Sequence, residues 1–181
     1  MKERLTATAP ARFAERFTKL TQGVTPSDGS RQKLIDQRRS AFATAKSSAE
    51  AGAKVYTVAC GACHRIGNEG GLVGPQLDGI ANRGLERLLE DILDPNRNVD
   101  HAFRTTVFIL KDGESVTGLF RREEGATIVY AIANGQEARV AKSDLKARRE
   151  SDLSLMPANF DEALTPQAMN DLLAFLLKTT K

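Results

Sequence analysis

The sequence contains no tryptophan, only two cysteines and two histidines, and no long apolar run. A helix that crosses a bilayer needs about 20 mostly apolar residues, so the sequence predicts no membrane span. The first residues, MKERLTATAPARFAERF, lack the apolar stretch of a secretory signal, and no signal peptide is predicted within them. Hydrophobic residues make up 41% and charged residues 27% of the 181, a balance typical of folded globular domains.

The basic charge is concentrated near the N-terminus. Residues 1–50 contain ten Lys and Arg against five Asp and Glu, whereas the whole chain carries a net charge of only +3. The rest of the chain is therefore mildly acidic. Within the basic segment the acidic residues are interleaved with the basic ones, which favours a solvated helical face. We predict no nucleic-acid surface.

The first 50 residues have helical spacing in two places. In residues 12–22, RFAERFTKLTQ, apolar side chains recur at i, i+4 and i+7. A turn-rich stretch, GVTPSDGS, separates them from a longer charged helix expected over residues 31–50. We interpret residues 1–47 as a helical arm or linker that does not build the core. Residues 48–181 are then the main domain.

The main domain changes character in its middle. A helix is predicted over residues 48–59, another over GLERLLEDILDP, and a last one after Thr165 with Pro166 at its first position. Between the last two, residues 104–150 alternate β-branched and polar side chains and are cut by DG, EG and NG turns. We predict four antiparallel strands there, closed by a fifth near 145–150. The predicted fold is mostly α with a small β insertion.

The stretch VYTVACGACHRIGNEGGLVGPQL holds both cysteines and one histidine. Cys60, Cys63 and His64 form the pattern C-x-x-C-H, which indicates covalent attachment of c-type haem. Two thiols on one helical turn can add to the two vinyl groups of one haem. The next residue then lies beneath the ring, where imidazole can coordinate iron.

Three other interpretations of the motif remain open at this point. A structural zinc site would need a fourth ligand, for which the sequence offers only the distant His101. A thioredoxin-like dithiol would need a βαβ frame, but here a helix precedes the motif and a Gly-rich loop follows it. The motif could also be a chance arrangement of two idle thiols.

Haem attachment would require further groups around the iron. A metal-bound histidine usually donates its other ring N–H to a fixed acceptor, and the carbonyl of Pro75 in GPQL is a good candidate for His64. Met156 lies in the loop LSLMPANF and is the favoured second axial ligand. Met169 lies on the apolar stripe of the last helix and is expected in the core. His101, or an iron left open or bound to water, are the alternatives.

These motifs resemble a known family. Y-x3-C-x2-C-H, then GP-x-L-x-GI, a later LMP and the closing LTPQ-x-MNDLLAFLL are similar to class I c-type cytochromes. GPQLDGIANRG, LLEDILDPNRNVD, FRTTVFILKDG and SDLSLMP resemble one branch of them, the haem-binding domains of the Pirellula/Verrucomicrobium type. The resemblance covers about residues 48–180.

The resemblance implies a class I cytochrome c helical fold around one covalent haem c. Cys60 and Cys63 would form the thioethers, His64 and Met156 would ligate the iron, and Pro75 would accept from His64. Domains of this type usually end larger exported proteins, after a module that oxidises a sugar or alcohol. We therefore expect a periplasmic or otherwise exported protein, of which this chain is a fragment.

The predicted function is single-electron transfer rather than enzyme catalysis, with a dehydrogenase module or partner as the electron donor. Arg83 and Arg104 are candidates for contacts with the haem propionates. The β insertion would shield one haem edge and dock a partner. The alternatives are a gas- or peroxide-binding haem protein with an open distal site, and a docking module in which haem is only a structural staple.

Overall fold

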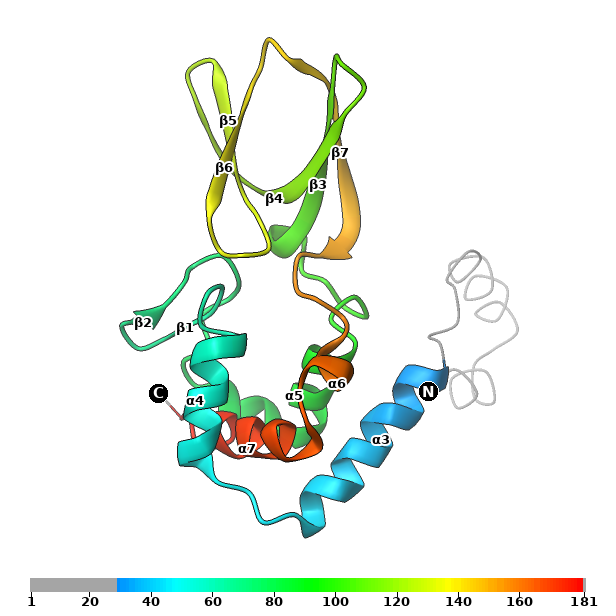
Figure 1. Cartoon of the computed structure of the whole chain (residues 1–181), viewed down its shortest axis with the longest axis vertical. Helices are drawn as coiled ribbons and strands as arrows, with labels where there is room; N and C mark the ends of the chain where they lie inside the picture. The colour runs from blue at the N-terminus through cyan, green and yellow to red at the C-terminus, as the bar shows by residue number, and fades with distance from the viewer. Residues whose placement is uncertain (1–28, 181) are drawn as a thin grey trace, which may run out of the picture.

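The computed structural model describes residues 29–180, with helices at one end of the molecule and a sheet at the other (Figure 1). The helices are α3 (Gly29–Thr44), α4 (Ala49–Ala59), α5 (Gly84–Leu93), α6 (Phe160–Ala163) and α7 (Pro166–Leu176), with 3-10 turns at Ile80–Arg83 and His101–Phe103. The strands are β1 (Arg65–Ile66), β2 (Glu69–Gly70), β3 (Arg104–Leu110), β4 (Ser115–Glu124), β5 (Thr127–Ala131), β6 (Glu137–Ala141) and β7 (Leu145–Ser154). The described chain is thus mixed α/β, which corrects the prediction of a mostly α fold. The helix expected over residues 12–22 lies outside the described residues.

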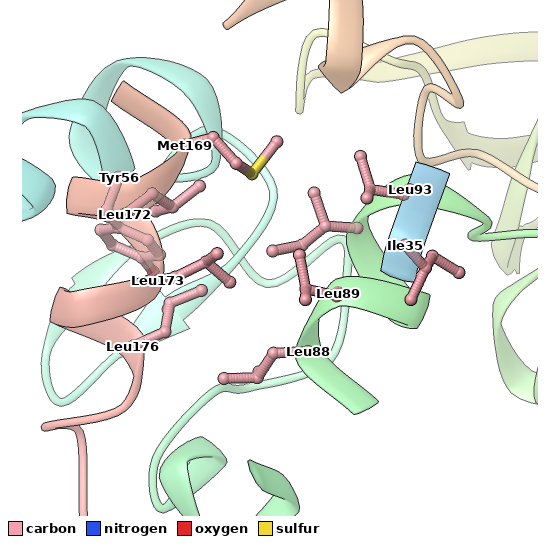
Figure 2. Packing of buried hydrophobic residues seen from close by; sticks show 10 residues of the cluster. Ile35, Tyr56, Leu88, Leu89, Leu93, Met169, Leu172, Leu173 and Leu176 are labelled. Atoms are coloured by element: carbon pink, nitrogen blue, oxygen red, sulfur yellow. The ribbon is translucent and has the colours of Figure 1, made fainter. Parts of the chain in front are cut away.

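The helical core is built by α4, α5 and α7. Its fully buried side chains come mainly from the apolar stripes of α5 and α7, which the spacing of leucines predicted: Leu88, Leu89, Ile92, Leu93, Met169, Leu172, Leu173 and Leu176. Figure 2 shows the side chains of the two helices pointing toward one another. Each α7 leucine is at most 4% exposed. Burial of each of these side chains therefore stabilises the fold by about 2 kcal/mol.

Helices α4 and α7 cross at a glycine. A Cβ built on Gly52 would lie only 1.9 Å from the carbonyl oxygen of Asp171 and 2.8 Å from Cβ of Phe175. Only a glycine lets the two backbones approach so closely. The rings of Tyr56 and Phe175 pack next to this crossing, with centroids 5.4 Å apart. The crossing holds the end of α4, and therefore the cysteine motif, against the C-terminal helix.

The helix predicted over residues 31–50 ends earlier, at Thr44, and α4 begins at Ala49, close to the start of the helix predicted over residues 48–59. Ser48 is the N-cap of α4, because its Oγ accepts the N–H of Ala51 at 3.2 Å. The N–H of Ser48 itself donates to the buried carboxylate of Asp171 at 2.7 Å. The break between Thr44 and Ala49 is therefore caused by a contact with α7, which helical periodicity does not report.

Helix α3 packs against α5. Its Ile35 is 1% exposed and belongs to the helical core, so the expectation that residues 1–47 add nothing to the core is wrong for this helix. Arg97, which follows α5, donates to Gln32 of α3 at 2.9 Å and to Glu90 at 3.1 Å. Apolar packing and this polar bridge together hold α3 on the main domain.

The predicted antiparallel sheet is present between α5 and α6. Its strand order is β6-β5-β4-β3-β7, and every neighbouring pair is antiparallel. The DG, EG and NG turns contain Gly113, Gly125 and Gly135, all at positive φ. The last strand continues to Ser154, beyond the expected end near residue 150. A core of Phe108, Ile128, Tyr130 and Val140 fills one side of the sheet.

In the part of the chain that the structure describes, no helix combines the length and the apolar character needed to cross a membrane.

Candidate functional site

The cysteine motif forms a tight turn at the end of α4. Cys60 caps the helix, and its carbonyl accepts the N–H groups of Cys63 at 3.1 Å and of His64 at 2.9 Å. The two bonds place all three side chains on one turn of backbone. Both cysteines are free thiols. The spacing of the motif therefore brings two free thiols and an imidazole onto one turn, the arrangement that the C-x-x-C-H pattern predicts.

His64 is oriented by the loop that follows the motif. Its Nδ1 lies 2.8 Å from the carbonyl oxygen of Pro75, the acceptor that the sequence indicated. A proton on Nδ1 leaves Nε2 unprotonated and able to bind a metal. Gly74 lies close to the ring, and a Cβ there would come within 2.6 Å of Cε1. Burial lowers the pKa of His64, and the hydrogen bond to Pro75 only partly opposes this, so the neutral ligand form is favoured.

A tyrosine fixes the backbone of the same histidine. The hydroxyl of Tyr56, one turn before Cys60, donates to the carbonyl of His64 at 2.8 Å. Burial is the main cause that raises the pKa of Tyr56 to about 12, with smaller contributions from Cys60 and Asp78. In the sequence, Tyr56 appears only as the first residue of Y-x3-C-x2-C-H. Its hydrogen bond to His64 was not predicted, because it depends on how the turn folds back onto α4.

We predict that Tyr56→Phe loses about 1 kcal/mol of stability at neutral pH, the usual net value of one hydrogen bond. The substitution also changes the pH dependence. In the native protein the raised pKa of Tyr56 means that its contribution is complete below pH 10.0 and is lost as the pH rises toward about 12. Urea unfolding at several pH values should show a smaller alkaline loss for Tyr56→Phe than for wild type. Tyr130→Phe is the matched control, and an equal change there would contradict the assignment.

The thiols do not have the character of a redox-active dithiol. Burial, followed by the charge of the neighbouring Cys63, raises the pKa of Cys60 to about 11, and burial also raises the pKa of Cys63. Reactive C-x-x-C cysteines instead have a lowered pKa. The motif also lies between a helix and a loop with two short strands, not in a βαβ unit. The structure gives the thioredoxin-like interpretation no support.

The zinc interpretation also finds no support. His101 lies in the 3-10 turn before β3, its side chain is 76% exposed, and its Nε2 contacts Glu150 of β7 at 3.3 Å. Among residues 29–180 no three His, Cys, Asp or Glu side chains are grouped so that they could hold a metal ion.

Met156 lies in the loop between β7 and α6. It is half-buried and packs against the helical core that also receives Cys60. The loop is held by a bond from its N–H to the hydroxyl of Ser154 at 3.1 Å. Met169 is fully buried on α7, as the sequence indicated, and its sulfur points into the core between α5 and α7 (Figure 2). Of the two described methionines, Met156 is therefore the one outside a regular element.

Residues 49–117 match the family model for cytochrome c. The match supports a c-type cytochrome domain, with the haem binding and electron transfer that characterise it. It includes α4, the cysteine motif and α5, and it ends within β4, so it covers neither Met156 nor α7. No curated protein matches the chain in sequence.

The two arginines predicted to contact haem propionates already have partners. Arg83 pairs with Asp91 of α5 at 3.1 Å. Arg104 pairs with Asp152 at 2.7 Å and also approaches the carbonyl of Val99 at 3.4 Å. Contacts of either side chain with haem propionates stay a prediction.

The residues of the motif fit a covalently bound haem. The two free thiols lie on one turn, the imidazole is neutral and fixed through Nδ1, and the position against its ring is kept free of a side chain by Gly74. An imidazole held in its neutral form is a donor that suits the iron of haem. The fit thus agrees with the family match.

Proposed function

We propose that the chain is a class I c-type cytochrome domain with one haem c, and that it transfers single electrons. The observation that carries the proposal is the imidazole of His64, held by the carbonyl of Pro75 directly after the cysteine pair. When bound, haem supplies an iron that alternates between the ferrous and ferric states. Neither change of state needs a proton or a substrate bound to the protein.

The residues of the chain hold and tune this group. Cys60 and Cys63 would attach it through thioethers, and His64, through Nε2, and Met156 would ligate its iron. Pro75 keeps the imidazole in the right tautomer and increases its basicity. The pairing of His with Met favours a relatively high reduction potential.

The wider setting of the domain is also a proposal. The segments that resemble the Pirellula/Verrucomicrobium-type haem-binding domains favour an exported protein whose electrons come from a dehydrogenase module or partner. Haem attachment of this kind takes place outside the cytoplasm in the family, which favours a periplasmic or equivalent location.

The test is the visible spectrum of the chain after maturation by the c-type haem machinery. We expect a split reduced spectrum, the weak long-wavelength band of methionine–ferric ligation, and no reaction with carbon monoxide. A thioether-linked haem that survives denaturation verifies Cys60 and Cys63. Rapid carbon monoxide binding would instead favour a gas- or peroxide-binding protein, and failure to attach haem would contradict the proposal.

A further inference from the structure

The turn between β5 and β6 is held by three hydrogen bonds. Ile132 N–H donates to the carbonyl of Gln136 at 2.9 Å, and Gly135 N–H donates to the carbonyl of Ile132 at 2.9 Å. The side-chain oxygen of Asn134 accepts the N–H of Gln136 at 2.9 Å. Figure 1 shows this turn pointing from the sheet toward the segment that carries β1 and β2, which follows the cysteine motif.

The turn meets the motif backbone at a glycine. A Cβ built on Gly135 would lie 2.3 Å from the carbonyl oxygen of Ala62, which directly precedes Cys63 in the motif. The φ angle of Gly135 is +84°, which side chains rarely adopt. Next to it, the carbonyl oxygen of Ala133 lies 3.8 Å from Sγ of Cys63. Once Cys63 forms a thioether, its sulfur has no proton to donate. Its contact with the carbonyl oxygen of Ala133 is then a van der Waals contact.

The neighbouring strand strengthens the same contact. The guanidinium of Arg121 on β4 donates to the carbonyl of Leu72 in the loop after the motif. The buried side chains of Val73, Leu119 and Ala131 also form a small apolar cluster. The partly buried side chains that pack against it are Cys63, Phe103 and Leu155. The cluster joins the sheet to the motif loop through residues far apart in the sequence.

The two cysteines consequently face different surroundings. Cys60 packs against the helical core, whereas Cys63 packs against the cluster that belongs to the sheet. Near the end of α4, Val58 is 87% exposed and lies beside an open groove that Val55 and Leu164 also line. The sheet therefore covers the motif on the side of Cys63.

We propose that the β5–β6 turn closes the Cys63 edge of the haem site against solvent, with Gly135 as the positioning residue that lets the turn close. The inference rests on the proposed function, because it assigns the sheet a role toward the bound haem. A dry apolar wall beside the site limits the access of water and of small oxidants, and it helps set the reduction potential. Electron exchange then takes place on the side of α4 that carries Val58.

The test compares Gly135→Val with Gly113→Val in the haem-loaded chain. Gly113 is the matched control, because it lies in another hairpin of the same sheet at φ +94° and a Cβ there meets nothing within 4 Å. Both substitutions add a side chain to a residue with positive φ and so strain its backbone equally in kind. Only Gly135→Val also pushes the turn away from Ala62. We expect hexacyanoferrate(III) to take an electron from reduced Gly135→Val severalfold faster than from wild type, and the reduction potential of that variant to fall.

A second readout does not depend on electron transfer. The N–H groups of Val73 and Gly74 both donate to the carbonyl of Cys63, at 3.1 and 2.8 Å. Hydrogen exchange at these two amides should become severalfold faster in Gly135→Val and stay unchanged in Gly113→Val.

Arg121→Gln provides a milder variant in case Gly135→Val does not fold. It removes the bond to Leu72 without adding strain, and Arg139→Gln, which removes an ion pair within the sheet, is its control. Equal oxidation rates in a variant and its control would overturn the inference. The proposed function would still stand in that case if the wild-type chain carries thioether-linked haem, whereas a chain that attaches no haem would remove both.

Discussion

Replacement of Met156 by alanine should lower the reduction potential and let carbon monoxide bind to the reduced protein. The thioether ligand is lost, and axial ligands set haem potentials over a range of about 0.8 V, so we expect a fall of about 0.2 V. The half-buried side chain also leaves the edge of the helical core, which should cost about 1–2 kcal/mol of stability. Potentiometry and carbon monoxide titration of the haem-loaded chain measure both effects.

The chain contains its own control for this experiment. Met169 has the same thioether but is fully buried on α7. Met169→Leu conserves volume and should cost less than about 1.5 kcal/mol while leaving the methionine–ferric band intact. If that band disappears in Met169→Leu and persists in Met156→Ala, the two methionines have been assigned the wrong way round.

Replacement of Gly52 by alanine should destabilise the protein by about 3 kcal/mol or more, the upper range for overpacking. Alanine is the better helix former by about 1 kcal/mol, so local propensity alone predicts the opposite sign. The added Cβ would lie 1.9 Å from the backbone oxygen of Asp171, and a backbone atom cannot be moved away by a change of rotamer. The melting temperature should fall by about 10 °C.

Thermal melts of Gly52→Ala and Lys54→Ala, followed by far-ultraviolet circular dichroism, measure this effect. Lys54 is exposed on the same helix, and its replacement should change the stability by less than about 0.5 kcal/mol. A stability of Gly52→Ala equal to or above that of wild type would show that α4 and α7 do not cross at this residue. Because the crossing supports the cysteine motif, the variant should also attach less haem.

Features encoded over a few neighbouring residues were predicted from the sequence. The cysteine motif, the GP loop beside it and the three glycine turns of the sheet each depend on local backbone geometry, and each is present where its residues indicated. The apolar stripes of α5 and α7 were predicted for the same reason, since a helix repeats its face every three to four residues.

Contacts between distant segments were not predictable in this way. The break before α4 depends on Asp171, more than a hundred residues later, and the core position of Ile35 depends on the placement of α3 against α5. The helices predicted over residues 31–50 and 48–59 overlapped, because helical periodicity reports which residues share a face and not where a helix ends. The true boundary follows from a hydrogen bond that forms after α7 has docked.

The sequence by itself determined the chemistry of the site: two thiols and an imidazole on one turn, with a proline carbonyl within reach. Only the tertiary structure decided what surrounds them. Close approach at Gly52 and Gly135 shows why, since a glycine looks the same in a sequence whether it lies in a turn or beneath another backbone. Which backbone comes near it depends on the packing of the whole chain, and here that packing places the sheet beside Cys63.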